Sequence, residues 1–370
     1  QLSRNMQEEQ LRLEAEEGRY TLYVVSACPY AARAWMAVKF YGLEAFVRVV
    51  RSFPGSGPNG WFFQPQSDWE EQAVKNYPEA VSDQEPHYGS KRLCELYKAI
   101  EPGYSGPFSL PLLYDRKCSC IASNASLSIA KALCSPHLKG FRSKNTEIEL
   151  LPSSADVTET EVHDQLLSEL NSTVTAGPYE VIFGDATQEK HEKRSKLFFD
   201  ALDKYEKLLR IQSVDMPSAY LMGQPRLADI FLFNTAVRWD VGYRWRFNIG
   251  GDSIQGGRFP CISALVTELQ AWDGVSGRDG AVHMDDIITA FYISTKLADA
   301  VAARPFCSPL PPRSGWQRLE SEIGNYQLGQ SRTLSRKTTR ESLSSSVTET
   351  EIVTLTAHQR EPCLKGLRTS

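Results

Sequence analysis

The residue with the clearest chemical potential is Cys28, in the segment Ser26-Ala27-Cys28-Pro29. A strand pattern precedes this segment and a helix pattern follows it, so Cys28 is predicted at a helix start. Unpaired backbone N–H groups and the helix dipole favour an anion there. Because a thiol reacts as thiolate, we expect the pKa of Cys28 to fall from about 8.5 into the range of about 3.5 to 7.5. A buried structural cysteine at a strand–helix junction is the alternative interpretation.

Cys28 has no second cysteine at C-x-x-C spacing, since the residue three positions later is Ala31. A single thiolate cannot resolve its own mixed disulfide, so it needs an external thiol. Glutathione is the obvious candidate, and we expect it as a co-substrate.

Two further positions fit such a site. Pro111 lies near the start of a predicted strand, and in thioredoxin-like folds a cis-proline faces the reactive helix start. Ser126 lies at a predicted helix start whose free N–H groups would suit the carboxylate at the γ-glutamyl end of glutathione. Simple helix capping explains Ser126 equally well, with Ser123 and Asn124 as the predicted N-caps.

The elements that must position these residues follow from apolar patterning. Residues 51–88 are rich in Pro, Gly and aromatics and are predicted as a long loop. Around it, the pattern predicts the order β-α-β-α-β-β-α, with strands at 19–25, 46–50, 109–114 and 121–122 and helices at 30–41, 91–100 and from 123 to 134. Five helical segments then follow, at 159–176, 187–211, 227–243, 259–272 and 285–303.

These patterns predict an α/β plus all-α protein, with a thioredoxin-like N-terminal domain and an all-helical C-terminal domain of the glutathione-transferase kind. The expected divisions are an N-terminal extension (1–17), a glutathione-binding domain (18–135), a linker (136–158), a helical substrate domain (159–312) and a Ser/Thr-rich, disordered tail (313–370).

Composition excludes several classes of protein. The net charge of -4 over 370 residues gives no general affinity for nucleic acid or a membrane surface, and no apolar run is long enough to span a membrane.

The eight cysteines are irregularly spaced, which favours reduced thiols in the cytoplasm over a disulfide framework. The spacing of Cys118 and Cys120 favours a turn between strands over a metal site, so no metal is expected. Residues 1–18 resemble no signal peptide, and organellar targeting stays open because the sequence begins at Gln1.

Several segments taken together resemble the glutathionyl-hydroquinone reductases, the Xi class of glutathione transferases, which are omega-like. The opening 18–24, followed by Ala27-Cys28-Pro29-Tyr30-Ala31, carries the likeness, although the family has Cys-Pro-Trp-Ala. Further matches occur in the same order, at 60–63, 104–106, 110–115, 177–183, 228–233 and 238–243.

The resemblance implies a mechanism and roles for residues. Cys28 would take glutathione from a glutathionyl-hydroquinone as a mixed disulfide, and a second glutathione would release it. Trp61, Leu110, Pro111 and Ser126 would bind glutathione. An aromatic or quinol thioether would meet Tyr179, Tyr243 and Tyr292, and the family's pairing through the helical domain implies a homodimer. Ordinary aromatic packing is the alternative for Trp61 and Tyr179.

The chain departs from the family pattern at three places. The family's Glu-Ser is Ala125-Ser126, which removes a carboxylate partner for the glutathione amino group. The family's substrate-contacting Tyr falls on Phe291, with Tyr292 as a stand-in. Arg226 replaces a capping Thr, so the helix that follows is expected to be less well capped.

Two other functions therefore stay open beside the hydroquinone reductase. One is an omega-like thioltransferase or dehydroascorbate reductase, which would use the same cysteine. The other is a degenerate, non-catalytic family member that acts as a binding module.

Overall fold

A computed structural model of the chain describes residues 11–184, 187–215, 219–247, 249, 253–254, 257–295, 297 and 299. Its first elements are β1 (Tyr20–Val24), α1 (Pro29–Tyr41), β2 (Val47–Arg51), α2 (Asp68–Asn76), α3 (Leu93–Ile100), β3 (Leu112–Asp115), β4 (Cys120–Ser123) and α4 (Ser126–Leu133). The strands form one sheet in the order β2-β1-β3-β4. Strand β1 pairs in parallel with β2 and antiparallel with β3, and β3 is antiparallel to β4. The predicted thioredoxin-like fold is confirmed.

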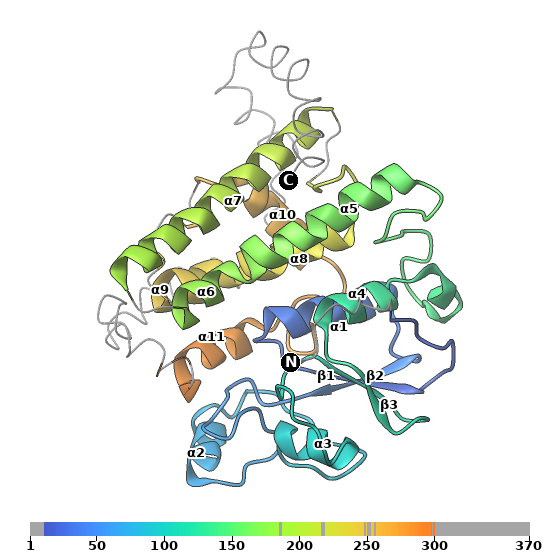
Figure 1. Cartoon of the computed structure of the whole chain (residues 1–370), viewed down its shortest axis with the longest axis vertical. Helices are drawn as coiled ribbons and strands as arrows, with labels where there is room; N and C mark the ends of the chain where they lie inside the picture. The colour runs from blue at the N-terminus through green and yellow to red at the C-terminus, as the bar shows by residue number, and fades with distance from the viewer. Residues whose placement is uncertain are drawn as a thin grey trace, which may run out of the picture.

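The sheet forms the middle layer of this half. Figure 1 shows α1 and α4 on one side of the strands and α3 on the other, with the later helices beyond α1 and α4. All five residues of β1 are buried because both faces of the sheet are covered. A central, doubly covered strand is a rigid support for the segment that leaves its end, Val25 to Cys28.

The ends of α1 follow the expected rules. Pro29 occupies the first turn, where its missing N–H costs no hydrogen bond. Gly42 ends the helix with a φ of 62°, a left-handed conformation that glycine adopts without steric cost. These two residues fix where α1 begins, and therefore where Cys28 lies.

Helix α2 corrects the prediction of a continuous loop over residues 51–88. Ser67 caps its start by accepting a hydrogen bond from the Glu70 backbone, and Asp68, Glu70 and Glu71 supply negative charge to the first turn. Glu70 is buried and forms an ion pair with Arg92 at 3.0 Å, which ties α2 to the start of α3. The surrounding Pro, Gly and aromatic residues obscured this short helix.

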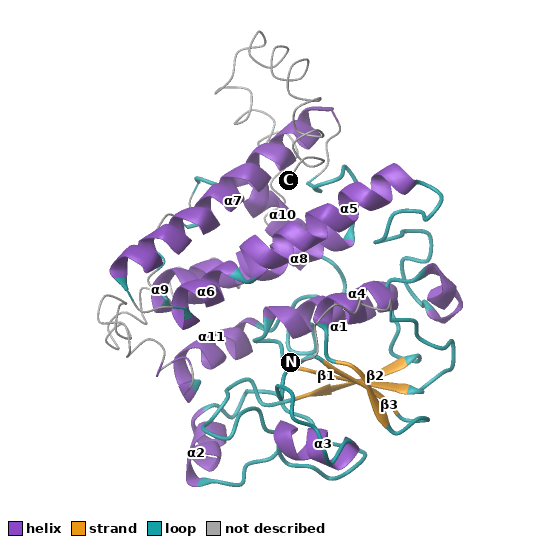
Figure 2. Ribbon diagram, viewed as in Figure 1, coloured by secondary structure: helices purple, strands orange, loops and turns teal. Residues whose placement is uncertain are grey.

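The rest of the described chain has no strand and consists of helices and connections (Figure 2). The elements are the 3₁₀ helix η1 (Pro136–Phe141), α5 (Val157–Glu169), the π-helical turn η2 (Leu170–Thr175), α6 (Gly177–Phe183), α7 (Gln188–Asp215), α8 (Leu227–Arg238), the π-helical turn η3 (Trp239–Tyr243), α9 (Arg244–Arg246), α10 (Pro260–Gln270) and α11 (Met284–Ile293). The prediction of an all-helical second half is confirmed. Helix α11 ends at Ile293 with Ser294 as its C-cap, and most of the remainder of the helix predicted up to residue 303 lies outside the described residues. No helix in the described residues has the length and apolar character to cross a bilayer.

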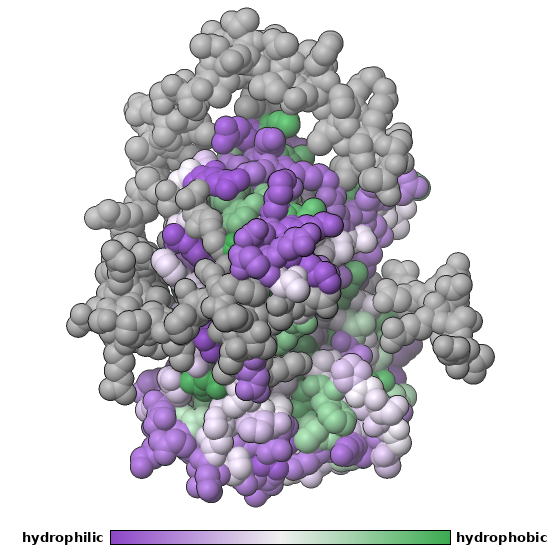
Figure 3. All heavy atoms as spheres, turned by 60° about the vertical axis from the view of Figure 1, so that its left-hand side comes forward, coloured by the Kyte–Doolittle hydropathy of each residue, from purple (hydrophilic) through white to green (hydrophobic). Residues whose placement is uncertain are grey.

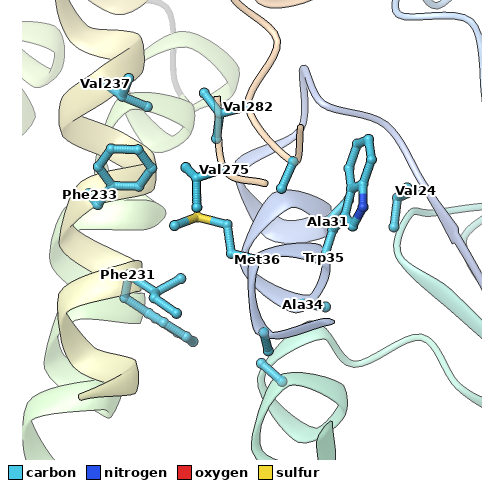
Figure 4. Close-up of a cluster of buried hydrophobic side chains, with 14 of the residues drawn as sticks. Val24, Ala31, Ala34, Trp35, Met36, Phe231, Phe233, Val237, Val275 and Val282 are labelled. Atoms are coloured by element: carbon cyan, nitrogen blue, oxygen red, sulfur yellow. The ribbon is translucent and has the colours of Figure 1, made fainter. Parts of the chain in front are cut away.

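The two halves share one hydrophobic core, and α1 and α8 meet within it. Figure 4 shows Met36 of α1 pointing toward α8, between Phe231, Phe233 and the neighbouring Val275. Met36, Phe231 and Phe233 are fully buried, and the Asn234 amide donates a hydrogen bond to the Met36 sulfur at 3.2 Å. Burial of this kind contributes about 1.5 to 3 kcal/mol for each large side chain. The contact holds the middle of α1, the helix that Cys28 begins, against the helical half.

The start of α8 is held by Asp229, whose carboxylate accepts hydrogen bonds from the backbone N–H groups of Leu221 and Arg226, both at 2.8 Å. Arg226 provides no side-chain cap to α8, as we expected from the loss of the family's Thr. Its guanidinium pairs with Glu159 and donates to the Glu149 carbonyl, so it ties α8 to α5 and the preceding segment. Asp229 is fully buried, and burial raises its pKa to about 7.

We predict that Asp229→Ala lowers the free energy of unfolding by about 2 to 5 kcal/mol, because it leaves two buried N–H donors unpaired. Urea denaturation followed by circular dichroism measures the change. Asp229→Asn is the matched comparison and should lose less than Asp229→Ala, because its single amide oxygen can still accept one of the two bonds, which the carboxylate accepts through different oxygens. A loss below about 1 kcal/mol in the alanine variant would contradict this account of the helix start.

Some sequence predictions concern residues outside the described part of the chain. Most of the N-terminal extension (1–17), the predicted end of the helical domain from 300 to 312 and the predicted tail (313–370) lie there.

Candidate active site

Cys28 occupies the N-cap position of α1, at the end of β1, as predicted. Its thiol is half-buried and lies 3.7 Å from the backbone carbonyl oxygen of Leu110, toward which it points. The Leu110–Pro111 peptide bond is cis, as expected. The structure therefore brings Cys28, Leu110 and Pro111 together from two strand ends.

The segment before Cys28 is held by a buried cation from the helical half. Arg238 of α8 donates from Nε to the carbonyl of Ala27 at 3.1 Å and from Nη2 to the carbonyl of Ser26. Its remaining nitrogen donates to the backbone and side-chain oxygens of Asn234, at 2.7 and 3.0 Å. Arg238 is fully buried, and no carboxylate in the described part of the chain pairs with it. Its charge is therefore balanced by carbonyl dipoles alone.

A second residue of the helical half binds the same segment. Asp286, near the start of α11, accepts a hydrogen bond from the Ser26 hydroxyl at 2.9 Å and lies 3.1 Å from the ring nitrogen of His283. Asp286 raises the pKa of His283, and burial opposes this effect. Ser26 is thus fixed from α8 through its carbonyl and from α11 through its side chain.

The pKa of Cys28 does not follow the expectation. Burial raises it above the ordinary value, although the backbone N–H groups of Ala31 and Tyr30 and the charges of Arg238 and Arg33 lower it. The helix start therefore stabilises the thiolate, but loss of solvation outweighs that effect. The sequence shows the helix start and not the depth at which the thiol lies.

A cleft of about 540 Å³ opens beside the thiol. Three of the predicted site residues line it, namely Cys28, Trp61 and Tyr179. Phe108 and Phe183, which also line it, are among the large hydrophobic side chains that the described surface leaves exposed. Figure 3 shows that hydrophilic residues cover much of the visible surface, with hydrophobic patches between them. An aromatic wall next to a reactive sulfur suits a flat apolar group.

Tyr179 receives a hydrogen bond at 3.1 Å from the hydroxyl of Tyr243, and the two rings pack edge to face. Tyr243 is fully buried and does not line the cleft, so it supports Tyr179 from behind. Burial raises the pKa of both phenols, so both are neutral donors near neutral pH.

Comparison with known proteins agrees with this geometry. The chain is 31% identical over 239 residues to a glutathione S-transferase omega-like protein of Schizosaccharomyces pombe, a match that spans 64% of this chain and 69% of the relative. It is 30% identical over 264 residues to a glutathionyl-hydroquinone reductase of Sphingobium chlorophenolicum, which spans 70% and 74%. The chain belongs to the glutathionyl-hydroquinone reductase, or Xi-class, family of glutathione transferases.

Solved structures extend the likeness over more of the chain. The Xi glutathione transferase of Phanerochaete chrysosporium matches with a TM-score of 0.65 and 29% identity, over 81% of this chain and 92% of that one. A Xi glutathione transferase of Saccharomyces cerevisiae in complex with glutathione matches with a TM-score of 0.66 and 26% identity, over 80% and 93%. No protein-family profile matches the chain. The protein is thus an enzyme of the glutathione transferase and glutathione-dependent oxidoreductase kind.

Ser126 of this family member lies at the first turn of α4, outside the cleft lining. Its hydroxyl accepts a hydrogen bond from Arg33, whose other terminal nitrogen donates to Asn171 at 2.9 Å. The predicted caps Ser123 and Asn124 do not cap α4, because Ala125 holds the N-cap position without a side-chain bond. The Asn124 amide instead donates to two tyrosine hydroxyls.

The predicted substrate residue Tyr292 is not among the described residues that line the cleft, whereas its neighbour Phe291 is. Phe291 packs edge to face on Tyr243, with 5.1 Å between ring centroids. Tyr292 is buried, and burial raises its pKa to about 12. The cleft therefore presents a ring without a hydroxyl where the family resemblance implies a tyrosine.

Sequence reasoning missed the cations that surround Cys28. Arg33 is almost completely buried, lies 4.0 Å from the Phe231 ring centroid and has its pKa lowered to about 10 by burial. The available signal was a lone arginine on the apolar helices predicted at 30–41 and 227–243, at Arg33 and Arg238. Among the described residues, no group of three or more His, Cys, Asp or Glu side chains could hold a metal ion.

We predict that Arg238→Gln raises the pKa of Cys28 further, because it removes a charge that stabilises the thiolate. Near pH 7 each unit lowers the thiolate fraction about tenfold. The measurement is the pH dependence of iodoacetamide alkylation, followed by mass spectrometry on the tryptic peptide Tyr20–Arg33, whose one cysteine is Cys28.

Two control variants belong to this experiment. Arg238→Lys keeps the charge and should shift the alkylation midpoint less than Arg238→Gln does. Arg258→Gln removes a partly exposed arginine that pairs with Asp203 and should leave the midpoint unchanged. A midpoint that does not move in Arg238→Gln would show that Arg238 does not tune the thiol.

Proposed function

We propose that this protein is a glutathione-dependent thiol reductase that removes glutathione from S-glutathionyl-hydroquinones. One observation carries the proposal: a half-buried cysteine thiol at a helix start, beside a cleft with an aromatic wall. The names of the relatives, which include glutathionyl-hydroquinone reductases, support it.

In the proposed reaction, the Cys28 thiolate attacks the sulfur that joins glutathione to the aromatic ring. The carbon–sulfur bond breaks, its electron pair stays on the ring carbon, and that carbon takes a proton to give free hydroquinone. Cys28 and glutathione then share a disulfide. A second glutathione thiolate attacks the glutathionyl sulfur, which releases glutathione disulfide and regenerates the Cys28 thiolate. Two glutathionyl sulfurs are thereby oxidised and the ring carbon is reduced.

The described residues would divide this work between them. The backbone of Leu110 beside Pro111 would pair with glutathione, Trp61 would lie along it, and the start of α4 at Ser126 would attract the γ-glutamyl carboxylate. Tyr179, oriented by Tyr243, would donate a hydrogen bond to a quinol oxygen. Phe291 can supply only a packing surface, so Tyr179 is the main donor in this account.

The same proposal covers the domain division, the cellular compartment and the oligomeric state of the protein. The division at residues 136–158 separates glutathione binding from substrate binding. All six cysteines in the described residues are free, which fits a reducing, cytoplasmic compartment. A homodimer is proposed on the family likeness, and size-exclusion chromatography with light scattering would measure it.

We predict that Cys28→Ser lowers kcat/KM for an S-glutathionyl-hydroquinone by about a thousandfold or more, because serine cannot form the mixed disulfide. Release of hydroquinone, followed by liquid chromatography, measures the rate. Cys94→Ser changes another half-buried thiol and serves as the control. Retained activity in Cys28→Ser would exclude the mechanism.

The same assay separates the other candidate functions. Cys28-dependent activity on small mixed disulfides or dehydroascorbate, without activity on the thioether, would identify a thioltransferase. Absence of glutathione binding by calorimetry would identify a binding module.

We predict that Ala125→Glu tightens glutathione binding about tenfold, because it restores a carboxylate for the ligand's ammonium group. Ala125 is exposed at the N-cap of α4, so the longer side chain can be accommodated. Calorimetry measures the dissociation constant, and Ala125→Gln is the neutral control. Equal effects of Glu and Gln would show that charge is not the cause, and no effect would show that the site lies elsewhere.

A further inference from the structure

A second pair of thiols lies far along the sheet from Cys28, in the turn between β3 and β4. Cys118 belongs to the turn, and Cys120 begins β4 opposite Asp115. Both side chains are exposed and free. Neither lines the cleft at Cys28, so the pair forms a separate feature of the molecule.

The shape of this turn brings the two side chains together. Successive side chains of an extended strand point to opposite faces, so residues two apart, such as Cys118 and Cys120, point to the same face. Here the intervening Ser119 has a φ of 51°, in the left-handed region that a residue other than glycine seldom adopts. The Asp115 carboxylate fixes the turn by accepting hydrogen bonds from the N–H groups of Lys117 at 2.9 Å and Cys118 at 3.1 Å. The two thiols therefore lie two residues apart in one tight turn, and the Cys118 thiol is among the groups that raise the pKa of Cys120.

The charges around the two thiols differ. The Arg19 guanidinium lies 3.5 Å from the Cys118 sulfur and is held in place by Asp115, at 2.7 Å. Burial raises the pKa of Cys120, and the charge of Asp115 and the Cys118 thiol add to the effect. Cys118, whose sulfur accepts the hydrogen bond from Arg19, is therefore placed as the attacking thiol and Cys120 as the resolving one.

The surroundings also suit an anionic disulfide. Arg19 pairs with Asp115 and Glu16, and the turn also carries Lys117, which pairs with Glu16 at 2.8 Å, and Arg116. Arg116 donates to the carbonyl of Gly18, which leaves its charge unneutralised by a carboxylate in the described residues. Glutathione disulfide carries a net negative charge, so this turn attracts it.

We propose that Cys118 and Cys120 form a second redox site, which glutathione disulfide oxidises to an intramolecular disulfide. The Cys118 thiolate attacks one sulfur of glutathione disulfide, that S–S bond breaks, and one glutathione leaves as a thiolate. The Cys120 thiolate then attacks the Cys118 sulfur and expels the second glutathione. The two cysteines lose two electrons and two protons, and the disulfide becomes two molecules of reduced glutathione. The oxidant, glutathione disulfide, is the product of the reaction proposed at Cys28. The oxidation state of Cys118 and Cys120 would therefore change as that product accumulates.

The sequence makes the test simple, because trypsin cleaves after Lys117 and Lys131. The peptide Cys118–Lys131 contains these two cysteines and no other. The reduced full-length protein is incubated with glutathione disulfide, its remaining thiols are alkylated, and the peptide is analysed by mass spectrometry. We expect a peptide that lacks two hydrogens and carries neither alkyl group nor glutathione. We expect Cys120→Ser to retain glutathione on Cys118, because the resolving thiol is absent.

The same experiment in Cys28→Ser separates this proposal from the proposed function. Since glutathione disulfide is added, the peptide should be oxidised equally in that variant, whatever Cys28 does. Three results would overturn the proposal: a peptide that stays reduced while the Cys28 peptide gains glutathione, a stable glutathione adduct in the unaltered turn, or a disulfide that joins two chains.

Discussion

The interaction on which the rest of the structure depends is the buried guanidinium of Arg238 against the carbonyls of Ser26 and Ala27. A charge taken out of water costs several kcal/mol unless hydrogen bonds replace its solvation. Arg238 makes four such bonds to the strand–helix junction and to its own helix, so α8 can hold it only while that junction is in place. The position of Cys28 and the packing of the two halves therefore depend on the same buried hydrogen bonds of Arg238.

The same constraint shapes the chemistry of the site. Arg238 and Arg33 both lower the pKa of Cys28, and both are buried without a carboxylate partner among the residues that the structure describes. The protein interior screens their charges weakly, so each charge stabilises the thiolate more than it would in water. The same burial removes water from the thiol, which disfavours its charged form. A ligand with a carboxylate at the start of α4 would meet Ser126 already bound to Arg33, so Arg33 would link the proposed γ-glutamyl site to the thiol.

Patterning predicted the sheet, the position of Cys28 and the all-helical half, because strand and helix periods and the Pro29 and Gly42 signals are local. Helix α2 escaped prediction because it is only nine residues long and its apolar contacts, through Trp69, Ala73 and Val74, belong to a small cluster apart from the main core. The roles of Arg33, Arg238 and Asp286 could not be predicted, since each contact joins residues far apart in the sequence. The resemblance put the family's substrate-contacting position on Phe291, and the fold was needed to show that Phe291 lines the cleft whereas Tyr292 does not.

The central claim is that Cys28 accepts glutathione from the substrate. The most direct measurement is rapid acid quenching of the enzyme with an S-glutathionyl-hydroquinone and no free glutathione, followed by mass spectrometry of peptide Tyr20–Arg33. The account predicts one glutathione on Cys28 for each hydroquinone released, and its loss when glutathione is added. Hydroquinone release without an adduct on this peptide, or an adduct confined to another cysteine, would contradict it.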